Sequence, residues 1–306
     1  MSAEFDLIRA ITADLPKSDK VTLGVGDDAA ALRFDGDAVV STDMMVENVH
    51  FKQAWSSAHD IGRKAVAVNV SDIEAMGAVP TAVVVALAVP RDLERAWIIE
   101  FSAGVREECD RAGVSLVGGD MSRSEVIVAC VTALGDVASR RPVTRAGARA
   151  GDVVAVVGKL GWAGAGFAAL SRGFRSPKDV VDEARCPEVP YGQGVVASDA
   201  GATSMMDISD GLVQDLGHIA ELSGVAIDID AATLEVSEPM ARVGAATGKA
   251  PLTFVLGGGE DHALAATFPD ADDVPEGWRV IGRVQEGSGV TVDGEEPEVT
   301  GWDHFA

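Results

Sequence analysis

The sequence predicts an α/β (α+β) chain that folds as two domains. Apolar runs typical of strands occur in series with stretches whose apolar residues recur every three to four positions, as in helices. A chain of 306 residues is longer than a single hydrophobic core usually stabilises. An arginine-rich segment then interrupts the pattern before a new series begins. We therefore expect an N-terminal domain over 1–137, a junction over 138–150 and a C-terminal domain over 151–306.

Composition narrows the function. Apolar residues make up 47% of the chain and aromatic residues only 5%, so the expected core is mostly Ala, Val, Leu and Ile. The net charge of −23 argues against binding of nucleic acid or of an anionic membrane, since both require a basic surface. A phosphate substrate would need imported cations, and its oxygen chemistry suits Mg²⁺. Surface solvation or adaptation to salt explains the acidic excess equally well.

Three further observations favour a cytoplasmic protein. The three cysteines are far apart, which is typical of a reducing compartment. The N-terminus shows no signal-peptide pattern. The longest apolar run, Ala82 to Pro90, is too short to cross a bilayer.

The N-terminal half contains the following predicted elements in order. We expect helices over 4–14, 57–76 and 92–111, with Ser57 and Asp60 as a capping pair and with Gly77 and Gly113 as stops. We expect strands over 21–25, 38–41, 81–89, 114–117 and 125–134.

Aspartates recur just where these strands end. Asp27 and Asp28 follow the first strand, Asp43 follows Ser41 and Thr42, and Asp120 follows Gly118 and Gly119. Asp72 instead falls beside Asn69 on the apolar stripe of the 57–76 helix, where a carboxylate is costly to bury uncompensated. Each position alone also fits a solvated turn or surface site. A metal or a polar network is the alternative.

The junction and the following glycines each allow two interpretations. Arg140, Arg141, Arg145 and Arg149 form either a basic linker or contacts to a nucleotide phosphate. After a strand over 153–157, residues 158–161 lack the spacing of a P-loop and match a Rossmann loop poorly. We predict a capping turn before a helix over 162–171.

The rest of the C-terminal half shows the same acidic pattern. Asp207 ends a strand, and Ser209 or Asp210 is able to cap a helix over 212–222. Strands are expected over 225–230, 254–256, 262–268 and 278–284, the second ending in the acidic turn 257–261. The aromatic end around Trp302 is expected to pack or to contact a ligand.

Convergence of these aspartates would require cations. Two unit charges about 4 Å apart repel by about 4 kcal/mol at an effective dielectric constant near 20. If the carboxylates meet, they must bind divalent cations, and several such cations imply a polyphosphate.

A family resemblance rests on an ordered set of motifs. They are GVGDDA (24–29), STDM (41–44), HF (50–51), AVNVSDIEAMGA (67–78), GGD (118–120), DISDGL (207–212) and GGGED (257–261). Each is weak alone, but together they closely resemble the thiamine-monophosphate kinases. That family shares a superfamily with aminoimidazole ribonucleotide synthetase, selenophosphate synthetase and a hydrogenase maturation dehydratase.

The resemblance implies a fold and a set of site residues. The N-terminal sheet would pair across a homodimer, and the C-terminal half would be an α/β sandwich. Several Mg²⁺ ions, ATP and thiamine phosphate would bind, and a need for K⁺ stays open. By resemblance, Asp43, Asp72 and Asp210 are catalytic; Gly119, Asp120, Arg145 and Ser209 contact the nucleotide; His50, Glu260 and Trp302 contact thiamine phosphate; and Asp28, Ser41, Thr42, Asp43, Asp72, Asp120, Asp207 and Asp210 bind metal.

The implied reaction is phosphorylation of thiamine phosphate to thiamine diphosphate by ATP. A phosphate monoester is largely dianionic at neutral pH, so a direct in-line transfer needs no general base. The alternatives are an aminoimidazole ribonucleotide synthetase-like enzyme and a non-catalytic sensor that binds Mg²⁺-nucleotide. The selenium and hydrogenase activities are disfavoured, because no cysteine precedes Asp28 or ends the chain.

Overall fold

The chain divides into two compact units, each with its own sheet. The computed structural model describes residues 10–12, 15, 18–26, 29–298 and 301. Unit 1 comprises Met1–Ile73 and Val79–Ser139, and unit 2 comprises Glu74–Ala78 and Arg140–Ala306. The predicted mixed α/β class is confirmed.

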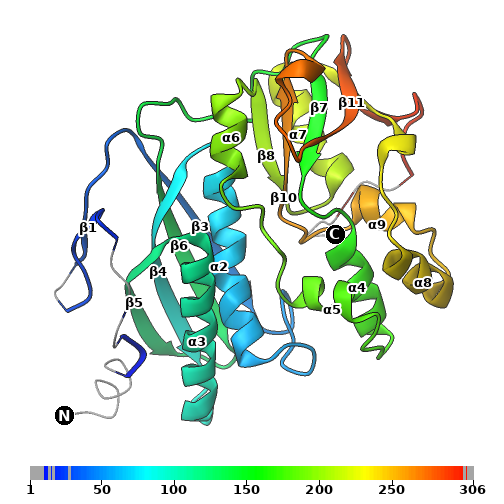
Figure 1. The fold of residues 1–306 in the computed structure, drawn as a ribbon. Helices are drawn as coiled ribbons and strands as arrows, with labels where there is room; N and C mark the ends of the chain where they lie inside the picture. Colours follow the sequence, from blue (N-terminus) through cyan, green and yellow to red (C-terminus); the bar gives the residue numbers. More distant parts are fainter. Residues whose placement is uncertain (1–9, 13–14, 16–17, 27–28, 299–300, 302–306) are drawn as a thin grey trace. The chain divides into compact units, whose positions relative to one another are not determined.

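Unit 1 is built on a four-stranded sheet with the order β3-β6-β4-β5. Strands β4 and β5 run parallel and the other neighbours run antiparallel. Helices α2 and α3 cover one face of this sheet (Figure 1). The elements of unit 1 are β1 (Val21–Leu23), β2 (Ala31–Leu32), β3 (Ala38–Val46), α2 (Ala58–Ala75), β4 (Val79–Val89), α3 (Arg95–Ala112), β5 (Ser115–Arg123) and β6 (Val128–Asp136); the last residues of α2 belong to unit 2.

The ends of both helices follow the predicted local signals. The Ser57 amide donates to the Asp60 carboxylate and the Asp60 amide donates to the Ser57 hydroxyl, which is a reciprocal capping box. Gly77 and Gly113 follow α2 and α3 in the left-handed conformation, at φ 67° and 68°. The helix predicted over 4–14 lies largely outside the described residues.

Unit 2 is built on a six-stranded sheet with the order β12-β9-β11-β7-β10-β8, in which only β12 and β9 run parallel. Residues Val153, Ala155 and Ala266 on one face pack with Ala197 of α6. The elements are β7 (Val153–Val157), α4 (Trp162–Ser171), α5 (Lys178–Arg185), α6 (Gln193–Asp199), β8 (Ser204–Ile208), α7 (Leu212–Ser223), β9 (Ala226–Ile229), η1 (Ala231–Thr233), α8 (Glu238–Thr247), α9 (Leu252–Gly257), β10 (Ala263–Phe268), η2 (Ala271–Asp273), β11 (Arg279–Gln285) and β12 (Gly289–Val292).

Three predicted strands were wrong in type or extent. Residues 254–256 are helical and belong to α9, which packs on α4 and α7. A short apolar run does not distinguish a strand from a buried helix, and tertiary contacts decide. Strands β3 and β5 continue through Asp43 and Asp120 instead of ending before them, because both segments pair with a neighbouring strand along their whole length.

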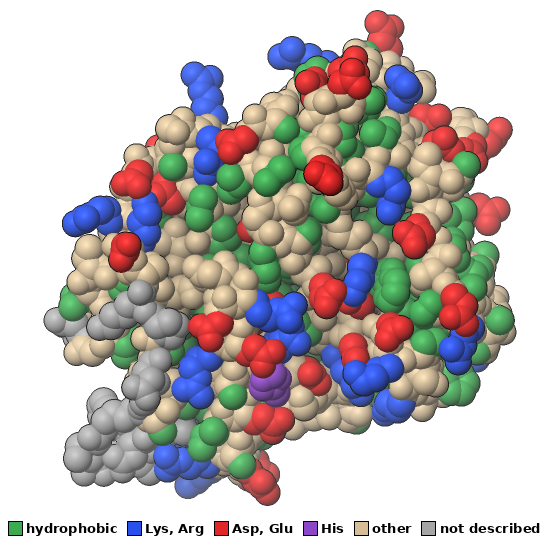
Figure 2. All heavy atoms as spheres, viewed as in Figure 1, with side chains coloured by type: hydrophobic (Ala, Val, Ile, Leu, Met, Phe, Trp, Pro, Cys, Tyr) green, Lys and Arg blue, Asp and Glu red, His purple; other side chains and the backbone are tan. Residues whose placement is uncertain are grey.

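Two further observations concern the surface charge and the length of the helices. Figure 2 shows acidic and basic side chains interspersed on the viewed face despite the net charge of −23. Among the helices that the structure describes, none is both long enough and apolar enough to cross a membrane.

Candidate active site

The first group of predicted site residues lies between β3 and α2 in unit 1. The Ser41 hydroxyl donates to the Asp72 carboxylate at 2.5 Å. The Asp43 amide donates to the Asn69 side-chain oxygen at 2.8 Å, and the Asn69 amide group donates to the Ala65 carbonyl at 2.9 Å. Strand alternation places Ser41 and Asp43 on the same face. The structure therefore brings Ser41, Asp43 and Asp72 to one side of the sheet.

Thr42 points to the other side of β3. Its hydroxyl donates to the Val131 carbonyl at 2.9 Å and lies 3.1 Å from the Thr132 hydroxyl. Successive side chains of a strand face opposite ways, so the Thr42 side chain does not join those of Ser41 and Asp43.

Gly119 and Asp120 line a pocket at β5. Its volume is about 140 Å³, and its wall is mainly apolar side chains of β4, α3 and β5, including Val85, Leu87 and Phe101. A Cβ atom on Gly119 would lie 2.2 Å from the Val85 carbonyl oxygen, so only glycine fits at this point of the strand pair.

His50 is held in the turn that follows β3. Its Nδ1 accepts a hydrogen bond from the Val46 amide at 3.0 Å. In the neutral ring this leaves the proton on Nε2, which becomes the donor. The buried Lys64 of α2 donates to the His50 carbonyl at 3.2 Å, and this hydrogen bond joins the turn to α2.

The second group of predicted site residues lies at the end of β8 in unit 2. Asp207 is buried, and its carboxylate lies 3.0 Å from Nδ1 of His262. Ser209 and Asp210 are half-buried in the turn before α7. Neither caps α7: instead the Asp215 carboxylate accepts from the amides of Asp210 and Gly211, both at 3.0 Å. The alternative that Ser209 and Asp210 are only capping residues is therefore wrong.

These surroundings also change the pKa of the Asp215 carboxyl group. Burial, with the nearby charge of Asp207 as the next cause, raises the pKa of Asp215 to about 7. Two carboxylates so placed repel, and a cation near Asp207 would relieve that repulsion.

Glu260 lies beside the same turn. Its amide donates to the Ser209 carbonyl at 2.6 Å, and the His262 amide donates to the Ile208 carbonyl at 2.8 Å. Residues 257–262, which we call the acidic turn, thus pack backbone to backbone against residues 207–211.

The junction arginines differ in their surroundings. Arg145 is exposed, while the half-buried Arg140 donates to the Gly77 carbonyl at 3.4 Å and lies 3.9 Å from the Asp199 carboxylate. Arg140 is therefore bonded within unit 2, whereas the exposed guanidinium of Arg145 is available to solvent.

The oxygen-rich donor set fits a hard cation. Ser41, Asp43 and Asp72 offer hydroxyl and carboxylate oxygens, the ligands that Mg²⁺ prefers. No group of three or more His, Cys, Asp or Glu within the described ranges forms a ready metal cage. The predicted carboxylates are divided between the two units, and Asp28 and Trp302 lie outside the described residues.

Four residues of these groups had no functional prediction. Asn69 was noted only for its place on the stripe of α2, and Asp215, Asp261 and His262 were not singled out. Asp261 is the last residue of the GGGED motif and His262 directly follows the motif, so closeness to Glu260 in the sequence was the signal available for these two.

Comparison with known proteins identifies the family. Models of the N-terminal and C-terminal domains of AIR synthase related proteins match residues 26–137 and 149–295. Thiamine-monophosphate kinase of Mycobacterium tuberculosis is 45% identical over 306 residues, which covers 99% of this chain and 91% of that protein.

Two solved structures are also similar. One, described as "AaThiL complexed with AMPPCP and TMP", has a TM-score of 0.81 and 34% identity over 99% of this chain and 96% of its own. Thiamine-monophosphate kinase from Stenotrophomonas maltophilia K279a has a TM-score of 0.82 and 34% identity over 97% of each chain. These similarities confirm the predicted resemblance: the chain belongs to the AIR synthase related family and, within it, to the thiamine-monophosphate kinases.

Proposed function

We propose that this protein transfers the γ-phosphate of ATP to thiamine phosphate, forming thiamine diphosphate and ADP. Membership of the family supports the activity, and a relative of 34% identity is described in complex with AMPPCP and TMP. The observation on this chain that carries the proposal is the group formed by Ser41, Asp43 and Asp72, whose oxygens face one side of the unit 1 sheet.

Mg²⁺ is the cation that these residues suit. In unit 1 the candidates are Ser41, Asp43, Asp72 and Asp120, and in unit 2 they are Asp207 and Asp210. Asp28 and Thr42 stay predictions, Thr42 through its backbone because its side chain faces away. When bound, Mg²⁺ supplies charge that offsets both phosphates and the transferring group.

The nucleotide base fits the pocket beside Gly119 and Asp120. At about 140 Å³ this pocket is smaller than the roughly 300–1,000 Å³ that encloses a whole drug-sized ligand, so it suits one ring system. Its apolar wall favours a flat base, and Asp120 at its rim lies where the polar part of a nucleotide would leave it. Ser209 and Arg145 are the proposed contacts of unit 2 to the phosphates.

Thiamine phosphate contacts His50, Glu260 and Trp302 in this proposal. The bond from the Val46 amide to Nδ1 of His50 leaves Nε2–H as a donor toward an anionic group. Glu260 offers a carboxylate to the cationic part of thiamine. The acceptor phosphate is already largely dianionic at neutral pH, so these residues need only orient it for in-line attack.

A homodimer is supported by the open face of the unit 1 sheet. On this face Val40 pairs across the strands with Leu134, and Met44 pairs with Cys130. Val40 is 61% exposed and Met44 is 54% exposed, so two large apolar side chains of the edge strand β3 face outward on the same side of the sheet. A second copy would cover them. The domains over 1–137 and 151–306 with a junction over 138–150 are part of this proposal; the division into two units supports it, although unit 2 also takes in Glu74–Ala78 and begins its long segment at Arg140.

The dimer is tested by light scattering on Val40→Lys. We expect this variant to be monomeric at concentrations where the unaltered protein is a dimer, because a charge would be buried at the interface. Leu222→Lys, at a 58% exposed site in unit 2, is the matched control and should leave the mass unchanged. A dimeric Val40→Lys would exclude this face.

A coupled ADP assay tests the activity. ADP should appear with thiamine phosphate and not with thiamine or aminoimidazole precursors. If ADP never forms with thiamine phosphate, the protein is a nucleotide-binding sensor and the kinase proposal fails. Protein labelled by radioactive ATP alone would indicate a phospho-enzyme and contradict direct transfer.

A further inference from the structure

The acidic turn has a backbone that requires support from outside it. Glu260 and His262 both lie in the left-handed region, at φ 69° and 50°. Residues with a side chain rarely adopt this conformation, and two such residues on either side of Asp261 are unusual. Such a turn keeps its shape only when neighbouring groups hold it.

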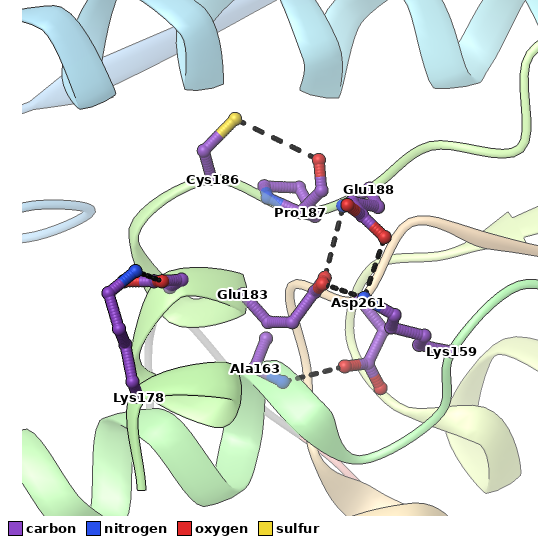
Figure 3. A network of polar contacts seen from close by, with 9 residues as sticks. Lys159, Ala163, Lys178, Glu183, Cys186, Pro187, Glu188 and Asp261 are labelled. Atoms are coloured by element: carbon purple, nitrogen blue, oxygen red, sulfur yellow. Dashed lines mark hydrogen bonds and ion pairs between the residues drawn. The ribbon is translucent and has the colours of Figure 1, made fainter. Parts of the chain in front are cut away.

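Asp261 fixes the acidic turn by capping helix α4, which lies far away in the sequence. Its buried carboxylate accepts from the Gly161 amide at 2.5 Å and from the Ala163 amide at 2.9 Å. Helix α4 has no side-chain cap from its own N-cap residue, Gly161. Figure 3 shows Asp261 reaching the first turn of α4 at Ala163. The turn predicted over 158–161 is thus a capping turn whose cap comes from 100 residues along the chain.

The acidic turn is also pressed against residues 207–211. A Cβ atom on Gly259 would lie 2.7 Å from the Ser209 carbonyl oxygen, and one on Gly211 would lie 2.9 Å from Gly257. The Glu260 and His262 amides also donate hydrogen bonds to residues 208 and 209. Because of these close contacts and hydrogen bonds, neither segment is able to shift without the other. The His262 ring then holds the Asp207 carboxylate at 3.0 Å.

Ion pairs fix the segment just before α4. Lys159 forms ion pairs with the buried Glu183 of α5 and, at 2.6 Å, with Glu188. The Glu188 amide donates to the Glu183 carboxylate at 3.1 Å. Figure 3 shows Lys159, Glu183 and Glu188 joined in one network beside Asp261. The carboxylate of Asp261 is therefore anchored to a platform fixed by charge pairs.

The geometry points to Asp261 as a positioning residue that fixes Glu260 and, through His262, the Asp207 carboxylate. This inference rests on the proposed function, which assigns thiamine phosphate to Glu260 and Mg²⁺ to Asp207. Asp261 touches neither ligand in this scheme. Its two hydrogen bonds to α4 hold the backbone between Glu260, which contacts the substrate, and His262, which contacts Asp207.

Asp261→Asn provides the test, because both carboxylate oxygens accept an amide N–H and an amide side chain replaces one acceptor with a donor. We expect the KM for thiamine phosphate to rise about tenfold and the Mg²⁺ concentration for half-maximal activity to rise, while the KM for ATP changes less than twofold. Ile227→Ala, in the core of β9, controls for general loss of stability in unit 2.

Hydrogen exchange gives a reading independent of activity. In Asp261→Asn the amides of Glu260 and His262 should exchange at least tenfold faster, and those of β9 should not. Faster exchange together with an unaltered protein that forms no ADP would support the anchor and reject only the kinase. Unchanged exchange, or KM values like those of Ile227→Ala, would overturn the inference.

If Asp261→Asn does not fold, Lys159→Met decides. Lys159 is partly exposed, and its replacement loosens the platform without changing any residue of the acidic turn. A selective rise of two- to fivefold in the KM for thiamine phosphate supports the inference. An unchanged KM together with unchanged exchange at Glu260 overturns it.

Discussion

Asn69→Ala is the sharpest test of how the unit 1 group is assembled. The Asn69 side chain is 1% exposed and connects the Asp43 amide on β3 to the Ala65 carbonyl within α2. The Ala65 carbonyl lies within helix α2, where the main chain also offers it a donor, so the important loss is the partner of the Asp43 amide. A buried donor without a partner costs about 1–3 kcal/mol, and the removed side-chain volume brings the total to about 2–4 kcal/mol.

The same change should affect catalysis more than stability explains. Without Asn69 the backbone at Asp43 is no longer tied to α2, so the carboxylate of Asp43 loses its fixed position relative to Asp72. A displacement of about 1 Å in a positioned group lowers a rate by about 10²-fold. We therefore expect kcat in the coupled ADP assay to fall about 10²-fold, with the loss in stability measured by urea unfolding.

Val83→Ala is the matched control for this experiment. Val83 is fully buried in β4, and its truncation should cost about 1–3 kcal/mol while leaving Asp43 and Asp72 untouched. We expect kcat of this variant to stay within threefold of the unaltered protein. A folded Asn69→Ala with a kcat like that of Val83→Ala would refute the positioning of Asp43 by Asn69.

Three other predictions follow from single residues. Asp43→Asn and Asp72→Asn should abolish ADP formation with an unchanged unfolding midpoint, and unfolding of either variant would indicate a structural role instead. Burial raises the pKa of Asp261 from its usual value near 4 to about 7. Between these two pH values the folded protein keeps a proton that the unfolded chain releases, so the free energy of unfolding should fall by up to about 4 kcal/mol as pH rises from 4 to 7. Urea unfolding at a series of pH values measures this change. Asp261→Asn should make that slope shallower without removing it, because Asp215 has a similarly raised pKa, and a flat profile in the unaltered protein would contradict the shift. Glu74→Ala removes the acceptor of the Gly192 and buried Gly194 amides and should lower stability by about 2–4 kcal/mol in urea, whereas Glu74→Gln, which keeps one acceptor, should lose about half as much.

Local features of the chain could be predicted from the sequence because neighbouring residues determine them. The capping box of Ser57 and Asp60 and the left-handed Gly77 and Gly113 depend on contacts within four residues. The place of Asp72 on the α2 stripe follows from helical periodicity alone. The ordered motifs were sufficient to identify the family, which comparison then confirmed.

The strands that carry Asp43 and Asp120 could not be read in this way. Serine, threonine, glycine and aspartate favour turns locally, so both strands were predicted to end too early. Pairing along β6 and β4 outweighs that preference, because each ladder hydrogen bond is made with a residue far along the chain.

The same reason explains the division of roles in unit 2. From the sequence, Ser209 and Asp210 were the natural caps for the next helix, and the capping turn predicted over 158–161 did not indicate which side chain caps α4. The tertiary structure gives the first task to Asp215 and the second to Asp261, which is 100 residues from its partner Gly161. The sequence alone thus predicted, by resemblance to the family, which carboxylates form the site. Only the tertiary structure decided that Asp215 and Asp261 accept hydrogen bonds from backbone amides, because the bond from Gly161 to Asp261 joins residues that only folding brings together.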